Sequence, residues 1–232
     1  MMKSRKLCGL LAASLACVFS VTATADPTDG NLSEHMHEHW ERVTQIQAAL
    51  IRGDLAAVRE PAEYLATHPT PATLPGQWEE YVGSMRAAAR AAAEAKDFAA
   101  AATATSLMGN TCGRCHVDSG IDVRFDIADP PGFEMDTTSH MLRHQWAADR
   151  MWEGLVGPSE PAWSRGVDAM LEAPLTPHEL KGGGDQPEKI KKMARRVHQL
   201  AGNAMMAVDG NEKAEIYAEF LANCADCHTA LD

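Results

Sequence analysis

The sequence predicts an all-α protein built as two tandem modules of four helices each. Apolar residues recur at steps of three and four along most of the chain, which is the spacing of one buried helix face. No stretch alternates apolar and polar residues for long enough to predict a β-strand. Two short patterns, H-M-x-x-H and C-x-x-C-H, each occur twice, about half a chain apart. We therefore expect modules at residues 26–118 and 138–232, joined by a linker at 119–137.

The first 25 residues have the features of an export signal peptide. Three basic residues precede an apolar run at 7–21, which is too short to span a bilayer. Ala23-Thr24-Ala25 then forms a small-residue cleavage site. We expect cleavage after Ala25 and export to the periplasm. Acylation of Cys17 is an alternative, but the residues before it lack the leucine that lipidation signals usually carry.

The chain without this leader is strongly acidic. It has 207 residues, of which 18 are basic and 32 acidic, so its net charge is −14 with histidine neutral. This charge disfavours nucleic acid and anionic membrane surfaces as partners, and it favours a redox partner protein with a basic docking face. No second apolar stretch is long enough to cross a membrane. Of six cysteines, the four outside the leader all belong to the two C-x-x-C-H motifs.

Four helices are expected in the first module. The first runs from residues 31–33 to 52, and Asp54 caps a second that ends at Thr67. Pro61 should kink or split this second helix because proline lacks an N–H group. A loop at 68–71 precedes a third helix at 77–95 and a fourth at 97–115. The last two helices are rich in alanine, which predicts either tight helix pairing or space for a flat macrocycle.

The second module repeats this order of elements. Its first helix carries H-M-x-x-H and ends at Gly157, and further helices are expected at 161–172 and 186–208. Asp209 and Gly210 form the turn before the last helix. The two H-M-x-x-H copies are 105 residues apart, whereas the two C-x-x-C-H copies are 112 residues apart. We expect the loop that contains Gly182, Gly183 and Gly184 to hold the seven extra residues.

The C-x-x-C-H motif is the attachment pattern of c-type haem. It occurs as Cys112-Gly113-Arg114-Cys115-His116 and again as Cys224-Ala225-Asp226-Cys227-His228. Two cysteines three positions apart on a helical turn can each form a thioether to one haem vinyl group, and the adjacent histidine can ligate the iron. The sequence therefore predicts two covalently bound haem c groups, with His116 and His228 as the proximal iron ligands.

Zinc binding and dithiol redox chemistry are the alternatives for these cysteines. The four thiolates could, for example, build a single zinc site. However, a histidine directly follows the second cysteine in both copies, and each copy closes its own helical segment. The export signal also suits haem attachment, which takes place outside the cytoplasm in bacteria. These observations favour haem.

With C-x-x-C-H late in each module, the chain resembles a tandem duplication of class II c-type cytochromes, the four-helix-bundle family of cytochrome c-prime. The resemblance covers essentially the whole chain after the leader, although each module is shorter than the usual family member. It implies two four-helix bundles, with the first helix of each crossing the distal face of its haem. Bundles of this family often pair through their first two helices, so a homodimer is an alternative to contact between the two modules.

The first helix of each module carries the candidates for the distal side of the iron. Met36 and His39 share a helix face, as do Met141 and His144. A thioether ligand raises the potential of a haem, whereas a second imidazole lowers it. We favour the methionines because a buried apolar face accepts a thioether more easily than an imidazole. The other histidines are interpreted as solvated in loops (His68, His178) or structural (His198).

The leading hypothesis for function is an electron carrier rather than an enzyme, namely a periplasmic dihaem cytochrome c that passes single electrons between redox partners. One alternative is binding of nitric oxide or carbon monoxide at an iron without a distal protein ligand. Another is a dihaem peroxidase. Known dihaem peroxidases, however, carry C-x-x-C-H early in each domain, and the chain has no acid–base constellation beyond the distal histidines.

Overall fold

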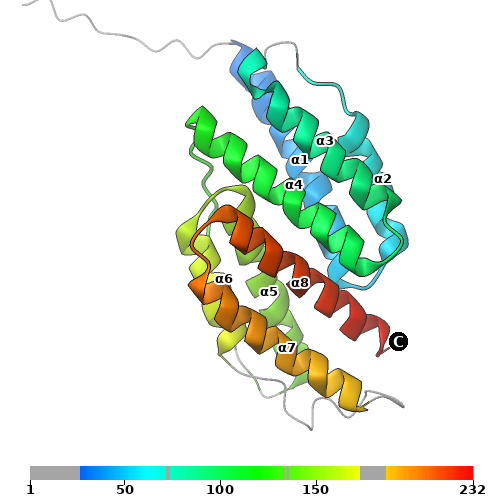
Figure 1. Ribbon diagram of the computed structural model, residues 1–232. Helices are drawn as coiled ribbons and strands as arrows, with labels where there is room; N and C mark the ends of the chain where they lie inside the picture. The colour runs from blue at the N-terminus through cyan, green and yellow to red at the C-terminus, as the bar shows by residue number, and fades with distance from the viewer. Residues whose placement is uncertain (1–26, 72–73, 133, 135, 173–186, 232) are drawn as a thin grey trace, which may run out of the picture.

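The described part of the chain is mostly helical (Figure 1). The computed structural model describes residues 27–71, 74–132, 134, 136–172 and 187–231. Within these residues there are eight α-helices, one short 3-10 helix and no β-strand. The prediction of an all-α protein is confirmed.

The helices follow the order and nearly the bounds that the sequence predicts. Consecutive helices pack against one another within residues 27–119 and again within residues 137–229. No helix occurs among the described residues between these two halves. The bounds are α1 Pro27–Ile51, α2 Leu55–Thr67, η1 Gly76–Trp78, α3 Glu79–Glu94, α4 Phe98–Ser119, α5 Thr137–Val156, α6 Glu160–Leu171, α7 Pro187–Met206 and α8 Gly210–Thr229.

Aspartate side chains cap the N-terminus of four helices and explain why these helices begin where they do. Asp54 accepts a hydrogen bond from the backbone N–H of Ala57, and Asp97 accepts one from Ala100. Asp136 at the start of α5 and Asp209 at the start of α8 each accept the same kind of hydrogen bond from a backbone N–H. Each carboxylate satisfies a backbone donor that has no partner within the helix and lies favourably in the helix dipole.

Pro61 does not split α2, so of the expected kink or split the split is wrong. The helix is continuous through Pro61, and the proline ring is buried beside Val58, Ala62 and Leu65. Packing of this face against the core offsets the hydrogen bond that proline cannot make.

The alanine-rich face of α3 and α4 serves tight helix pairing. Ala88, Ala89 and Ala92 of α3 are buried, as are Ala101 and Ala102 of α4, and the two helices pack directly on each other. No alanine lines the large cavity described below. Of the two interpretations of these alanines, the structure supports close packing.

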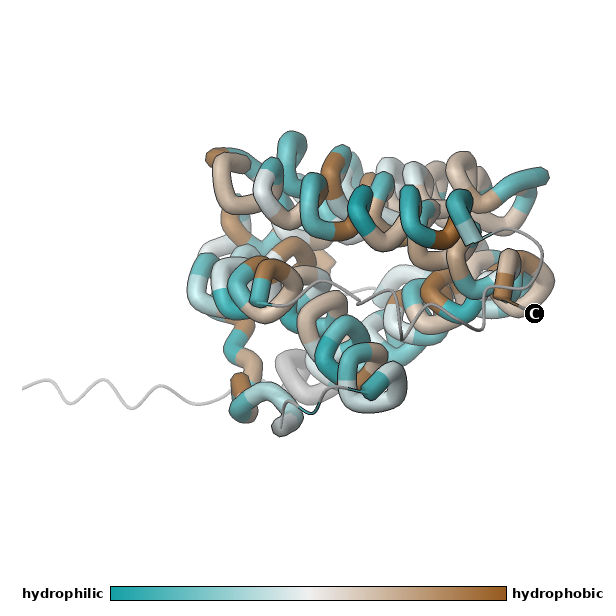
Figure 2. The backbone as a smooth tube through the Cα atoms, turned by 90° about the horizontal axis from the view of Figure 1, so that it is seen from below, coloured by the Kyte–Doolittle hydropathy of each residue, from teal (hydrophilic) through white to brown (hydrophobic). Residues whose placement is uncertain are grey.

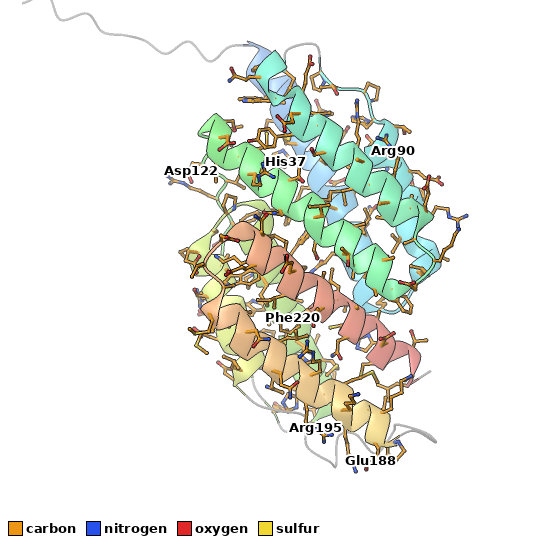
Figure 3. The ribbon with its side chains drawn as sticks, viewed as in Figure 1. His37, Arg90, Asp122, Glu188, Arg195 and Phe220 are labelled. Carbon is orange, nitrogen blue, oxygen red and sulfur yellow. The ribbon has the colours of Figure 1, made fainter. Side chains whose placement is uncertain are left out.

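One continuous hydrophobic core joins the two halves through α4 and α8, which lie side by side in the middle of the molecule (Figure 1). Brown and teal alternate along the helices in Figure 2, because each turn carries residues for the core and residues for solvent. Phe220 of α8 is buried in this core, whereas Glu188 and Arg195 are exposed on α7 (Figure 3).

Hydrogen bonds also cross between the halves inside the core. Tyr217 of α8 is fully buried; its hydroxyl donates to the carbonyl of Ala148 (2.9 Å) and accepts from Gln47 Nε2 of α1 (2.9 Å). Trp152 of α5 stacks on the Tyr217 ring at 5.6 Å. Among the described helices, none has the length and apolar character needed to cross a bilayer.

The helices α4 and α8 run in opposite directions (Figure 1). Asn110, late in α4, donates from Nδ2 to the Oδ1 of Asn211 at the start of α8 (2.7 Å). The C-terminal ends of the two helices therefore point to opposite ends of the molecule, and these are the ends that carry the C-x-x-C-H motifs.

Candidate functional site

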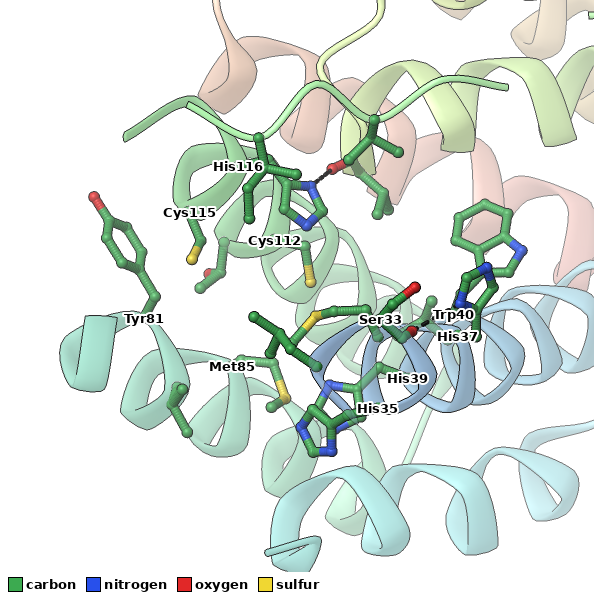
Figure 4. Close-up of a pocket in the computed structure, with 18 of the residues that line it drawn as sticks. Ser33, His35, His37, His39, Trp40, Tyr81, Met85, Cys112, Cys115 and His116 are labelled. Carbon is green, nitrogen blue, oxygen red and sulfur yellow. Dashed lines mark hydrogen bonds between the residues drawn. The ribbon is translucent and has the colours of Figure 1, made fainter. Parts of the chain in front are cut away.

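A cavity of about 620 Å³ opens between the C-terminal end of α4 and the N-terminal part of α1 (Figure 4). Cys112, Cys115 and His116 line one wall, as the first C-x-x-C-H motif predicts. The opposite wall comes from α1, and residues of α3 and the segment at 121–125 close the sides. Most of the exposed lining is apolar, and the volume lies within the range of cofactor pockets.

His116 is oriented by the other half of the chain. Its Nδ1 lies 2.9 Å from the backbone oxygen of Val156, the last residue of α5. Because a carbonyl oxygen can only accept, Nδ1 carries the proton and Nε2 keeps its lone pair. Burial lowers the pKa of His116, and the bond to Val156 opposes this shift. The imidazole thus has the tautomer of a metal ligand whose second nitrogen is held by the protein.

Burial raises the pKa of all four thiols in the two motifs. Burial raises the pKa of Cys112 to about 12, with a smaller contribution from Cys115. Burial likewise raises the pKa of Cys224 to about 12. Reactive dithiols have a lowered thiol pKa, so these cysteines do not have the electrostatics of a dithiol redox pair.

Four residues of the H-M-x-x-H segment in α1 line the cavity: His35, Met36, His37 and His39. Met36 is 37% exposed, so it lies at an open part of the wall and not on the fully buried face we expected. His35 is the more buried residue, at 8% exposure, and His39 is half-buried. In Figure 4 the rings of His35 and His39 lie together on the side of the cavity opposite His116.

His68 is not a solvated loop residue, which corrects the sequence interpretation. It is half-buried at the end of α2, where its Nε2 lies 3.1 Å from Nδ1 of His35. The loop is held in place by Arg86, which donates to the backbone oxygen of His68 and to the hydroxyl of Thr70 (2.8 Å). Sequence reasoning missed this contact because it depends on how the loop folds back over α1.

Three histidines therefore meet at one wall of the cavity. The candidate ligand atoms of His35, His39 and His68 all lie within 4.8 Å of one another. Burial, together with the two neighbouring imidazoles, lowers the pKa of His39 to about 3, and burial lowers the pKa of His35 as well. The spacing of four residues between His35 and His39 was the available sequence signal, because it places both on one helix face.

The second motif lies at the other end of the molecule. Cys224, Cys227 and His228 are half-buried near the end of α8, a helix that contacts α1, α4, α5 and α7. A Cβ added at Gly53, just past α1, would lie 2.5 Å from Oγ1 of Thr229 and 3.0 Å from the backbone oxygen of Ala225. The sharp turn at Gly53, with a φ of +73°, thus packs directly against the end of α8.

Histidines also gather at the N-terminal part of α5. His140 is buried, and its ring lies 6.1 Å from that of His144. The ring of His144 lies 6.5 Å from that of His198 on α7. Burial lowers the pKa of His198, and His140 adds to the shift. His198 thus lies beside His144, and its interpretation as a structural residue stays a prediction. Met141 is half-buried in the same segment, while His178 and residues 182–184 lie outside the described residues.

The two motifs are far apart. The first packs near the start of α1, around Met36, and the second near its end, at Gly53. At 1.5 Å per residue, the intervening stretch of helix spans roughly 25 Å. The four thiols of this chain therefore cannot converge on one metal ion, and the alternative of a single four-thiolate zinc site is wrong.

In comparisons with known proteins, no protein family, no curated protein and no solved structure matches this chain.

Proposed function

We propose that this protein is an exported dihaem c-type cytochrome that carries single electrons between redox partners. The observation that carries the proposal is the arrangement of His116, whose Nδ1 is bound to Val156 while Cys112 and Cys115 line the same cavity. A c-type haem needs two thiols and one imidazole with a free nitrogen on a single helical turn, and the end of α4 supplies all three.

Each residue of the first site has a defined role in this proposal. Cys112 and Cys115 form the two thioethers, and His116 is the proximal ligand through Nε2. The bond from Nδ1 to the Val156 carbonyl fixes the tautomer and the ring orientation, and it makes the imidazole a better electron donor to iron. The haem itself supplies an iron that cycles between ferric and ferrous by one electron.

Cys224, Cys227 and His228 play the same roles at the end of α8. The high thiol pKa at both motifs supports haem attachment over dithiol chemistry, because a redox dithiol needs an accessible thiolate. Two four-helix bundles of the class II cytochrome type, α1–α4 and α5–α8, are the architecture that this proposal assigns to the chain.

On the distal side we assign Met36 and Met141 as the iron ligands, ahead of His39 and His144. Met36 lines the cavity across from His116, and methionine has the flexible side chain needed to reach an iron from an open wall. His39 is engaged instead with His35 and His68, whose ligand atoms lie within 4.8 Å of one another.

The leader sequence supports export of this carrier to the periplasm, and the charge of the chain favours a particular kind of partner. A net charge of −14 after removal of 25 residues favours partners that present a basic face, because electrostatic steering raises the rate of transient encounters. Transient encounters suit a carrier that must bind and release two partners in turn.

Optical and EPR spectroscopy of the purified protein, ferric and ferrous, with and without carbon monoxide, tests this function. We expect two covalent haems per chain, both low-spin, no uptake of carbon monoxide and a sulfur-to-iron charge-transfer band. A high-spin iron that binds carbon monoxide would contradict electron transfer and would support gas binding as the function.

Variants that lack one pair of cysteines provide the matched control. Cys112→Ala with Cys115→Ala should leave one covalent haem per chain, and so should Cys224→Ala with Cys227→Ala. Haem that remains attached after denaturation and extraction is the quantity to measure. A wild-type chain that retains none under these conditions would overturn the proposal.

A further inference from the structure

Three histidines that line the cavity lie close together, and none of them belongs to a C-x-x-C-H motif. His35 and His39 lie one turn apart on α1, and their ring centroids are 4.1 Å apart. His68 follows α2, and its ring stacks on that of His35 at 4.8 Å. Since the candidate ligand atoms of all three fall within 4.8 Å of one another, they surround one small volume.

Neighbouring side chains hold this cluster in position. The ring of Tyr64 stacks on His68 at 4.5 Å, and its hydroxyl donates to Oε2 of Glu38 (3.0 Å). The same Oε2 lies 3.4 Å from Nε2 of His68. Arg86 fixes the backbone of His68 from the other side. A carboxylate is thereby placed beside the three imidazoles.

One nitrogen of the cluster lacks a partner. Nε2 of His39 is buried and makes no hydrogen bond to any described residue. A buried imidazole nitrogen without a partner is costly unless it binds something. Together with the convergence of the ligand atoms, this nitrogen points to a ligand that accepts several lone pairs at once, which is a metal ion.

The distances suit a tetrahedral site. Zinc–nitrogen bonds of about 2.0–2.1 Å place neighbouring ligand atoms about 3.3–3.4 Å apart. His68 Nε2 lies 3.1 Å from His35 Nδ1 and 3.4 Å from the Glu38 carboxylate, so two edges of the tetrahedron are already present. Because the histidine ligand atoms are up to 4.8 Å apart, His39 has to approach by up to about 1.5 Å through rotation of its side chain, and Glu38 has to turn towards the other two imidazoles.

We propose that His35, His39 and His68 form a binding site for a divalent transition-metal ion, separate from the proposed haem iron, and that the carboxylate of Glu38, which lies beside His68, moves into the fourth position. Imidazole ligands select zinc, copper or nickel over calcium and magnesium, which take oxygen ligands. The site does not depend on covalent haem, since none of its ligands belongs to C-x-x-C-H.

The second half of the chain lacks one essential element of this site. Arg143 stands where the 105-residue repeat places Glu38, and it forms an ion pair with Glu172. A cation in this position repels a metal ion instead of ligating it. We therefore expect one metal ion per chain, bound in the first half, and not two.

Titration of the chelator-treated full-length protein with Zn²⁺ by calorimetry tests the proposal. We expect one tightly bound Zn²⁺ per chain. His68→Ala should weaken binding by roughly 100-fold or more, and so should His39→Ala. The matched control is His37→Ala, on the same helix: His37 bonds to the backbone oxygen of Ser33 and lies outside the cluster.

Haem spectra recorded on the same variants separate this site from the haem. His68→Ala should lose Zn²⁺ and keep the wild-type optical and EPR spectra. The proposal is overturned if the wild type binds no Zn²⁺, if His68→Ala binds it as the wild type does, or if His68→Ala converts a low-spin haem to high spin. Zinc binding can be read with or without covalent haem, so failure here is distinct from failure of the cytochrome function.

Discussion

The backbone oxygen of Val156 holds the imidazole of His116 at 2.9 Å, although the two residues belong to different halves of the chain. The contact is possible because α4 approaches the end of α5 closely at Gly113. A Cβ added at Gly113 would lie only 2.4 Å from the backbone oxygen of Leu155. The glycine inside the first C-x-x-C-H motif therefore sets the position of the carbonyl that orients the adjacent histidine.

Gly113→Ala should disturb both stability and the haem. Because the new methyl group collides with backbone, the end of α5 must move away, and we expect a loss of about 1–3 kcal/mol in the free energy of unfolding. The ferric EPR signal of one haem should also shift as His116 loses its orientation. Denaturant unfolding and EPR measure the two effects.

Gly83→Ala is the control for that substitution. Gly83 lies on an exposed part of α3 with nothing within 4 Å of an added Cβ. Alanine there should stabilise the helix by up to about 1 kcal/mol and leave the EPR signal unchanged. Equal effects of the two substitutions would contradict the role assigned to Gly113.

Tyr217→Phe should destabilise the core where the halves meet. It removes both the acceptor for Gln47, which keeps a hydrogen bond to Asp149, and the donor to the Ala148 carbonyl, so two buried hydrogen bonds are lost. We expect a loss of about 1–3 kcal/mol in the free energy of unfolding. Tyr81→Phe removes a hydroxyl that bonds to exposed Asp118, and its effect should stay within about 0.5 kcal/mol. A similar loss in both variants would argue against the buried network.

The stability of the protein should fall between pH 4.5 and 7 because of Glu153. Burial raises the pKa of this carboxyl from 4.5 to about 7; Arg150 opposes the shift and Asp149 adds to it. The folded state therefore holds the proton more tightly than the unfolded state. The stability it contributes is complete below pH 4.5, declines as the pH rises to 7, and is then constant, a change of about 1–3 kcal/mol.

Glu153→Gln should flatten this part of the pH profile, which unfolding measured at several pH values would reveal. The amide cannot ionise and still accepts a hydrogen bond from Arg150. Glu94→Gln, at the exposed end of α3, should retain the wild-type profile. If Glu153→Gln also retains it, another group is responsible.

The two proposed haem sites should behave as independent redox centres. Because the motifs lie at opposite ends of the α4–α8 pair, roughly 25 Å apart by helix rise, neither iron should perturb the other magnetically. The EPR spectrum and the redox titration of the wild type should equal the sum of those of the two cysteine variants that each keep one haem. A coupled spectrum in the wild type would show that the irons lie much closer together.

The sequence predicted the helices well because their limits are set locally. Asp54 and Asp97 cap the next residues along the chain, and Gly120 ends α4 in a left-handed conformation with a φ of +68°. Tertiary contacts decided the rest. Pro61 stays within α2 because it is packed, and His68 reaches His35 because Arg86 holds its loop. No local pattern could have predicted the bond from His116 to Val156, since it joins residues 40 positions apart.

If the two halves are copies of one module, as we propose, then the antiparallel contact of α4 with α8 corresponds to an isologous dimer interface whose two copies are joined by one chain. In a dimer of identical chains, every substitution appears at both ends at once. Joining the copies removes that constraint, because each copy can then change by itself. Glu38 in the first half therefore corresponds to Arg143 in the second, and Gly113 corresponds to Ala225. The proposed second metal site can therefore exist at one end and be absent from the other, so the two ends can differ in a way that those of a symmetric pair cannot.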